Sequence, residues 1–173
     1  KTMMKLSGNI VGRIDRSDPR YSALTEIHAR LALKDATIWG PAAAAEAAVR
    51  LNWIDLPERS RNLLPLLDAL SAKHREKTRV VLCGMGGSSL GPEVIAQSFK
   101  RDLFILDSTD PNYVAHALNG NLAKTLVIVS SKSGSTIETA SQRAVFEGAF
   151  VDAGLRAQDH IVIVTDPDSP LDR

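Results

Sequence analysis

Hydrophobic positions in the first half of the chain recur at helical spacing. Asp18-Pro19 is a typical helix start, and the apolar face predicted behind it carries Tyr21, Leu24, Ile27, His28 and Leu31. Gly40-Pro41 opens an alanine-rich second helix, PAAAAEAAVRLNW, and Pro57 opens a third in which Pro65 predicts a kink. Residues 1–17 are polar and glycine-punctuated, which predicts a loose lead-in. We therefore expect a helical N-terminal region over residues 1–78.

The spacing changes at Arg79, where short continuous apolar runs begin to alternate with segments of helical length. The runs are Val80–Cys83, Leu103–Leu106, Thr125–Val129 and His160–Val164, and the helical segments lie near 89–100, 111–119 and 136–154. Strands that are apolar on both faces are typical of a parallel sheet covered by helices on each side. Residues 79–173 thus predict an α/β fold, a three-layer α/β/α doubly wound parallel sheet with right-handed crossovers.

The last apolar run is followed by Thr165-Asp166-Pro167-Asp168-Ser169-Pro170, which predicts a loop and a helix start. Doubly wound sheets commonly have more strands than the four counted here. We therefore expect the second domain to be incomplete at its C-terminus and the chain to be a fragment.

Composition narrows the class of protein. The 173 residues carry 21 Lys and Arg against 20 Asp and Glu, a net charge of +1, which gives no long-range field for nucleic acid or an anionic membrane. No apolar run has the length of a membrane helix, and the N-terminus KTMMKLSGNI lacks the apolar stretch of a signal peptide. One cysteine forms no internal disulfide, and no metal-binding spacing is present. A cytoplasmic protein without a metal or cofactor is the expectation.

A glycine-rich turn, GMGGSSLGP over residues 84–92, follows the first predicted strand. Glycine allows close backbone approach and positive φ, and the N–H groups at the start of the next helix attract anions. The turn suits an anion or a polar sugar. Packing between strand and helix is the alternative reason for such glycines.

A second loop, SSKSGSTIET over residues 130–139, follows the third predicted strand. Its hydroxyls, one lysine and a helix start are the donors that a phosphate requires, although one of Ser133, Ser135 or Thr136 could serve only as a helix N-cap. If the strand order is 2-1-3-4, the order reverses between the first and third strands. The two loops would then lie side by side.

Other reactive residue types have ordinary explanations. The four histidines show no paired spacing, Cys83 ends a buried strand, and Trp39 and Trp53 are expected to anchor helix packing. Asp107, near the end of the second strand, could hold a ribose hydroxyl in a dinucleotide-binding oxidoreductase domain, which is one alternative hypothesis. That hypothesis leaves the hydroxyl-rich loop unexplained.

Four phrases, VLCGMGGSSLGPEVI, LDSTDP, VIVSSKSGSTIET and VTDPDSPL, resemble in order and spacing the first sugar-isomerase (SIS) domain of the bacterial glucose-6-phosphate isomerase family. LALKDATIWG and RLNWIDLPERSRNLLP resemble that family's helical lead-in, including forms fused to transaldolase. The resemblance implies interconversion of glucose 6-phosphate and fructose 6-phosphate through an enediol, by a cytoplasmic enzyme of glycolysis and gluconeogenesis that is typically a homodimer.

The resemblance also implies which residues bind substrate: Gly87 and Ser88 at the sugar, and Ser131, Lys132 (through its backbone), Ser133, Gly134, Ser135 and Thr136 at the phosphate. Many family members carry aspartate where this chain has Ser89. The family's acid and base residues lie in later segments whose motifs are absent here, and Glu138 belongs to the phosphate loop. We therefore expect no catalytic residue and no turnover in this chain. A stand-alone SIS module that senses a phosphosugar and regulates a partner is the first alternative, ahead of the dinucleotide-binding domain.

Overall fold

The computed structural model describes residues 7, 8 and 15–172, so most of the predicted lead-in lies outside the described residues. Contacts divide the chain into two compact units, Lys1–Leu67 and Asp68–Arg173. The domain boundary near residue 78 stays a prediction, since the second half of one helix, α4, groups with the sheet. Within the described residues, no helix combines the length and apolar character that crossing a membrane requires.

The first unit is built of short helices. They are α1 (Pro19–Ala32), η2 (Ala36–Trp39), η3 (Pro41–Ala43), α2 (Ala44–Arg50), η4 (Leu51–Trp53), α3 (Leu56–Arg59), η5 (Ser60–Leu63) and the start of α4 (Leu64–Lys73). The predicted cap of α1 is confirmed, because the Asp18 carboxylate accepts a hydrogen bond from Arg20 N–H and Pro19 opens the helix. The expected helices are present, in shorter pieces.

Three predictions about this unit are wrong. The proposed apolar face of α1 contains no buried residue, and Leu24 is 67% exposed. Trp39 and Trp53 are 56% and 59% exposed, so they line an open apolar groove with Ala47 and Leu51 and do not anchor a packed core. Pro65 kinks no long helix, because α3, η5 and α4 are separate and Pro65 lies in the first turn of α4, where its missing N–H costs no hydrogen bond.

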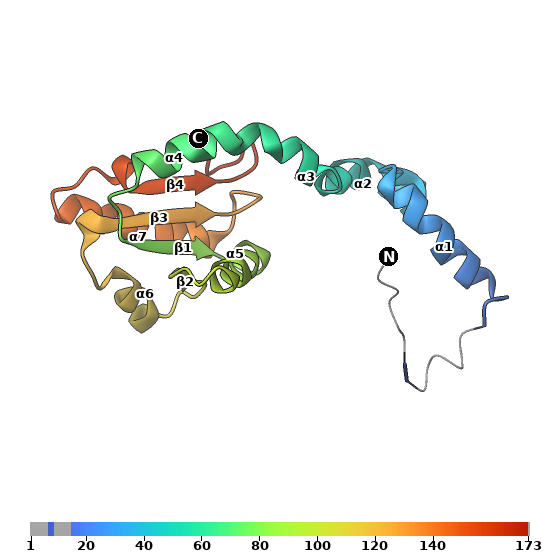
Figure 1. The fold of residues 1–173 in the computed structure, drawn as a ribbon, viewed down its shortest axis with the longest axis horizontal. Helices are drawn as coiled ribbons and strands as arrows, with labels where there is room; N and C mark the ends of the chain where they lie inside the picture. Colours follow the sequence, from blue (N-terminus) through green and yellow to red (C-terminus); the bar gives the residue numbers. More distant parts are fainter. Residues whose placement is uncertain (1–6, 9–14, 173) are drawn as a thin grey trace. The chain divides into compact units, whose positions relative to one another are not determined.

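The second unit confirms the predicted fold class. Its elements after α4 are β1 (Arg79–Gly84), α5 (Gly87–Ser98), β2 (Phe104–Leu106), α6 (Pro111–Leu118), η6 (Leu122–Lys124), β3 (Thr125–Ser130), α7 (Ile137–Asp152), η7 (Ala157–Asp159) and β4 (Ile161–Val164). The four strands are parallel and lie in the order β2-β1-β3-β4, as predicted. Figure 1 shows the arrowheads of β1, β3 and β4 at one edge of the sheet, where α5 begins.

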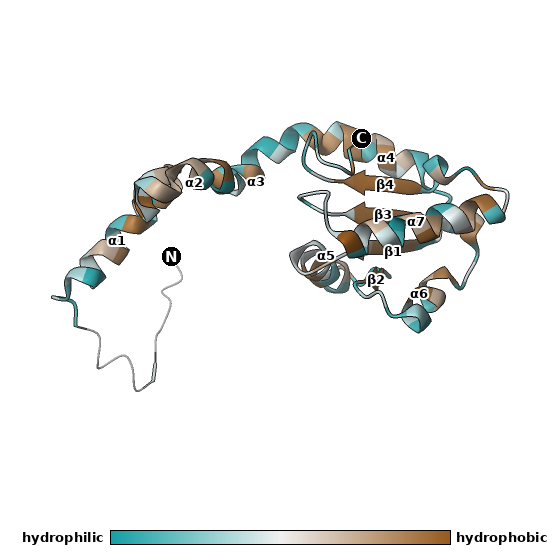
Figure 2. Ribbon diagram, turned by 180° about the vertical axis from the view of Figure 1, so that it is seen from behind, coloured by the Kyte–Doolittle hydropathy of each residue, from teal (hydrophilic) through white to brown (hydrophobic). Residues whose placement is uncertain are grey.

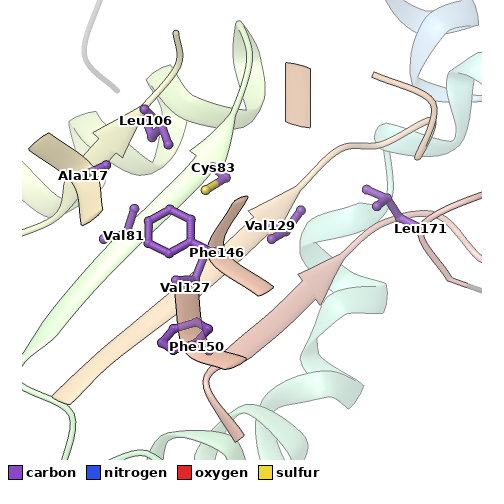
Figure 3. Close-up of a cluster of buried hydrophobic side chains, with 9 residues drawn as sticks. All are labelled: Val81, Cys83, Leu106, Ala117, Val127, Val129, Phe146, Phe150 and Leu171. Carbon is purple, nitrogen blue, oxygen red and sulfur yellow. The ribbon is translucent and has the colours of Figure 1, made fainter. Parts of the chain in front are cut away.

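The core lies between the sheet and α7. Phe146 and Phe150 of α7 are fully buried against Val81, Val127 and Val129 (Figure 3). Seen from behind the sheet in Figure 2, α7 crosses β1 and β3. The outward-facing positions of β3 are only half-buried, so the expectation of strands buried on both faces holds for the centre of β1 and not for β3.

Residues 165–172 form a series of turns and not the helix start that the DPDSP sequence predicted. Leu171 of this segment is 7% exposed and joins the core cluster. The segment is therefore anchored at both ends, by β4 and by Leu171.

Candidate functional site

The two predicted loops begin on adjacent strands at the same register position. Gly84, the last residue of β1, pairs with Ser130, the last residue of β3. A Cβ at Gly84 would lie 3.2 Å from the carbonyl oxygens of both Ser130 and Ser88. That distance is shorter than most contacts that Cβ atoms make in proteins. Glycine at this position lets β1, β3 and the first turn of α5 meet. The predicted adjacency of the two loops is confirmed.

The first loop turns sharply from β1 into α5. Gly86 has φ +56°, a conformation that favours glycine, and it precedes α5 without any side-chain cap on the helix. Gly87 and Ser88 are the first two residues of α5, with Gly87 exposed and Ser88 half-buried. The N–H end of α5 is thus uncovered by side-chain acceptors.

Ser89, the position where many relatives were expected to carry aspartate, has a structural role in this chain. It is 1% exposed, and its hydroxyl donates to the Gly86 carbonyl over 2.9 Å. This bond links the first turn of α5 back to the glycine that precedes the helix and so stabilises the turn. A buried aspartate at this position would lack the proton that Ser89 donates, because an ionised carboxylate only accepts hydrogen bonds.

Four hydroxyls of the second loop form two hydrogen-bonded pairs. Ser131, 3% exposed, lies 2.9 Å from the Thr136 hydroxyl and ties the two ends of the loop together. Ser135 donates to the Ser133 hydroxyl over 2.9 Å, and both of these residues are exposed. The loop therefore has one pair that joins its ends, the buried Ser131 with the half-buried Thr136, and one exposed pair, Ser133 with Ser135.

Gly134 forms the turn between the two pairs. Its φ is +66°, it is buried, and its N–H donates to the Ser131 carbonyl over 3.2 Å. A side chain at this position would collide with Ser169, whose Cβ lies 2.7 Å from where a Cβ of residue 134 would sit. Glycine is thus required here for both backbone conformation and space.

The start of α7 is available to an anion. Thr136 occupies the N-cap position, but its side chain makes no capping bond, because its hydroxyl pairs with Ser131. One of the three hydroxyl residues was predicted as a possible N-cap, and Thr136 does occupy that position. Its hydroxyl, however, does not make the capping hydrogen bond. The N–H groups of the first turn have no intrahelical acceptor and form the partial positive end of the helix dipole.

Charge around the second loop suits the same ligand. Lys132 is exposed, and within residues 15–172 no carboxylate forms a salt bridge with it. Its carbonyl accepts from Asp166 N–H over 3.1 Å, which fixes the backbone of the loop. In the described part of the chain, no group of three or more His, Cys, Asp or Glu side chains could hold a metal ion.

The remaining reactive residues lie elsewhere or are inert. Burial raises the pKa of the Cys83 thiol to about 12, which fits a core residue and not a nucleophile. His160 is buried under Phe150 and contacts the Thr125 carbonyl at the opposite end of the sheet from the loops. Asp107 follows β2 and is exposed. None of these residues joins the two loops.

Sequence reasoning missed the contribution of the segment after β4. Ser169 is 7% exposed, packs against Gly134 and lies 2.7 Å from the Thr165 hydroxyl. A signal was present, since in a parallel sheet the residues after β4 emerge at the same edge as those after β3. Nothing in the local sequence indicates that they close over the loop.

Comparison with known proteins identifies the family. The family model described as phosphoglucose isomerase matches residues 69–167. The chain is 36% identical over 126 residues to the glucose-6-phosphate isomerase of Chlamydia pneumoniae, covering 68% of this chain and 24% of that protein. It is 40% identical over 102 residues to the glucose-6-phosphate isomerase of a Cyanothece species, covering 54% and 19% respectively.

Two solved structures resemble this chain in both fold and sequence. The chain superposes with a TM-score of 0.61 and 31% identity on a glucose-6-phosphate isomerase from Chlamydia trachomatis, over 75% of this chain and 25% of that one. A hypothetical protein from Thermus thermophilus gives a TM-score of 0.70 at 33% identity, over 88% of this chain and 36% of that one.

The chain spans about a quarter of the length of the curated relatives it matches. The matched residues contain β1 to β4 and both loops, and the Chlamydia pneumoniae and Cyanothece relatives are named as glucose-6-phosphate isomerases. Parallel topology, paired loops and sequence similarity over the same residues point to one conclusion: this chain belongs to the phosphoglucose isomerase family.

Proposed function

We propose that this chain is the part of a glucose-6-phosphate isomerase that binds the phosphate and the sugar of glucose 6-phosphate or fructose 6-phosphate. Ser133, Ser135 and Thr136 are the proposed hydroxyl donors to the phosphate, with the backbone N–H group of Lys132 beside them and Gly134 forming the turn of the loop. Gly87 and Ser88 are the proposed contacts to the sugar. Ser131 is proposed to position Thr136 through the hydrogen bond between their hydroxyls.

One observation carries this proposal: the Gly84–Ser130 pairing brings two uncapped helix starts and a hydroxyl-rich loop to one edge of the sheet. A dianionic phosphate accepts several hydrogen bonds at once and is stabilised by helix N-termini. A neutral sugar would gain far less from the second loop.

The parent enzyme's reaction is proposed as proton transfer between C1 and C2 of the open-chain sugar through an enediol. Such a transfer needs a general base within hydrogen-bond reach of the carbon-bound proton. The relatives' acid and base residues are expected outside the segment matched here, so this chain is proposed to bind without turnover.

Calorimetric titration with glucose 6-phosphate, fructose 6-phosphate, unphosphorylated glucose and NAD tests the proposal, together with a coupled isomerase assay on the same sample. Binding of both phosphosugars, none of glucose and no turnover is the expected result. Tight NAD binding without any response to phosphosugars would overturn the proposal in favour of a dinucleotide site. Turnover would show that this chain carries acid and base residues of its own.

The parent enzyme is also proposed to be a cytoplasmic homodimer. A buried, unpaired Cys83 is compatible with a reducing compartment. Light scattering on a chain of the relatives' full length is expected to give twice the monomer mass, and a monomer at micromolar concentration would contradict the dimer.

A further inference from the structure

The second loop shares its backbone hydrogen bonds with the chain that follows β4. Ser131 N–H donates to the Val164 carbonyl over 3.0 Å, and Asp166 N–H donates to the Lys132 carbonyl over 3.1 Å. These bonds continue the β3–β4 ladder beyond the ends of both strands. The backbone of Ser131 and Lys132 in the loop is therefore held by residues 164–166.

Close packing holds the turn of the loop as well. Gly134 is buried, and Ser169 and the backbone N of Leu171 occupy the space that a side chain at residue 134 would need. The Leu171 N lies 3.0 Å from that Cβ position. Residues 165–172 thus cover one side of the loop along its length.

This covering segment keeps its own shape through a small hydrogen-bond network. The Thr165 and Ser169 hydroxyls lie 2.7 Å apart, Ser169 N–H donates to the Asp166 carbonyl, and Asp168 N–H donates to an Asp172 carboxylate oxygen over 2.9 Å. Leu171 anchors the far end in the core cluster, beyond Val129 in the view of Figure 3. Thr165–Ser169 is the one hydroxyl pair among the described residues that joins the start of the segment to the residue packed on Gly134.

From these contacts we infer that Thr165 and Ser169 are positioning residues for the hydroxyl-rich loop, an inference that rests on the proposed function. Their hydrogen bond holds Ser169 against Gly134, and Gly134 sets the direction of the backbone N–H groups and of the exposed Ser133–Ser135 pair. Neither residue needs to touch the phosphate. Their effect on binding acts through the shape of the loop.

The test uses the whole chain, glucose 6-phosphate as the probe, and four substitutions. Thr165→Val and Ser169→Ala delete one partner of the hydroxyl pair each, Thr165→Ser keeps the hydroxyl, and Ser98→Ala removes an exposed hydroxyl on α5 that bonds the Val94 carbonyl. We expect Thr165→Val and Ser169→Ala each to raise Kd by roughly three- to tenfold, the range for one lost hydrogen bond. The double substitution is expected to cost little more than either alone, because both remove the same bond.

Thr165→Ser and Ser98→Ala are expected to leave Kd within about twofold of the unsubstituted chain, since neither removes a hydroxyl of the pair. Unchanged Kd in Thr165→Val and Ser169→Ala would overturn the inference, even if their melting temperatures fall. Equal losses in Thr165→Ser, which keeps the hydroxyl, and in Thr165→Val, which removes it, would also overturn the inference, because the loss of binding would then not depend on the hydroxyl.

Hydrogen exchange of the Gly134 amide gives an independent measurement that needs no ligand. Thr165→Val and Ser169→Ala are expected to accelerate exchange at Gly134, whose N–H bonds the Ser131 carbonyl, while the core amides of β3 stay protected. If the unsubstituted chain binds no phosphosugar, the proposed function fails. Exchange then decides alone whether Thr165 and Ser169 hold the loop, and an unchanged Gly134 rate rejects it.

Discussion

At the scale of single residues, the candidate site depends on glycines as much as on hydroxyls. Gly84 and Gly134 are both placed where a side chain would meet neighbouring atoms, and only Gly134 also has positive φ. The hydroxyl positions were visible in the sequence. The reason for each glycine became clear only from the neighbours that the fold brings to it.

Replacing Gly134 by alanine is expected to destabilise the chain. The left-handed backbone conformation alone costs about 1–2 kcal/mol for a residue with a Cβ, and the contact with Ser169 adds to it. Urea unfolding followed by circular dichroism measures the loss. Gly148→Ala is the matched control, because Gly148 lies within α7 with open space at its Cβ position, and there alanine is expected to stabilise by up to about 1 kcal/mol.

Replacing Ser131 and Thr136 together by alanine is expected to weaken glucose 6-phosphate binding markedly. A hydrogen bond to a charged group is worth about 1.5–3 kcal/mol, and the substitutions also remove the pair that ties the loop ends together. Calorimetric titration measures the change. Ser141→Ala on α7, whose hydroxyl bonds the Ile137 carbonyl, serves as control, and an unaltered affinity in the double variant would remove this loop from the site.

At the scale of secondary-structure elements, the first turn of α5 depends on Ser89. Its buried hydroxyl bonds the Gly86 carbonyl, so Ser89→Ala leaves that carbonyl with one bond fewer. We expect a loss of about 1 kcal/mol in the free energy of unfolding. Denaturant titration checks the loss, and Ser89→Asp, which introduces a charge at a buried position, is expected to lower the free energy of unfolding further than Ser89→Ala.

The end of α4 gives the chain a pH-dependent stability. Burial, followed by the nearby Lys73 and Lys77, lowers the pKa of His74 below its ordinary value of 6.5. Below that ordinary value the unfolded chain takes up a proton more readily than the folded one, so the contribution of His74 is fully present at neutral pH and is lost as pH falls. Unfolding free energies measured between about pH 5 and pH 7.5 are expected to rise with pH.

His74→Gln removes the titrating group and is expected to flatten that dependence. Ser98→Ala on α5, which changes no ionisable group, is the control and should leave the slope unchanged. An equal slope in His74→Gln and in the unsubstituted chain would assign the pH effect to other residues.

The bounds of the strands could be predicted from the sequence more accurately than the packing of the helices. All four strands were predicted to within a residue or two, because continuous β-branched runs between glycine and polar turns leave few alternatives. The helices of the first unit were predicted less well: the stripe on α1 resembles a core face, yet Leu24 is exposed. Spacing reveals which residues share a face and not whether anything packs on it.

In the candidate site, too, some features could be predicted from the sequence and others depend on tertiary packing. Both loops and their adjacency follow from strand order and composition, which are local or topological properties. The contact between Gly134 and Ser169 joins residues that no spacing rule relates, and the Ser131–Thr136 pair takes the place of the capping bond that the sequence allowed for Thr136. Such contacts depend on side-chain packing after the fold is complete.

At the scale of the whole molecule, the candidate site lies within one compact unit. Asp68–Arg173 contains the sheet, the core cluster and both loops. We therefore expect a chain of residues 68–173 to unfold cooperatively by thermal circular dichroism and to bind glucose 6-phosphate within about threefold of the 173-residue chain.

Residues 1–67 expressed alone are the control for that truncation. Their described helices bury few residues, Ala47 and Leu51 among them, and a broad, weakly cooperative melt is expected. Loss of cooperative unfolding or of binding in the shorter chain would mean that the sheet depends on the preceding helices.

The pairing of Gly84 with Ser130 also has a kinetic consequence. The two residues are separated in sequence by two α-helices and an entire strand, so β1 and β3 can meet only after a large loop of chain has closed. The two loops of the candidate site are consequently not brought together until β1 and β3 have paired. A phosphosugar added during refolding should leave the folding rate unaltered and slow unfolding instead, because it recognises only the native arrangement.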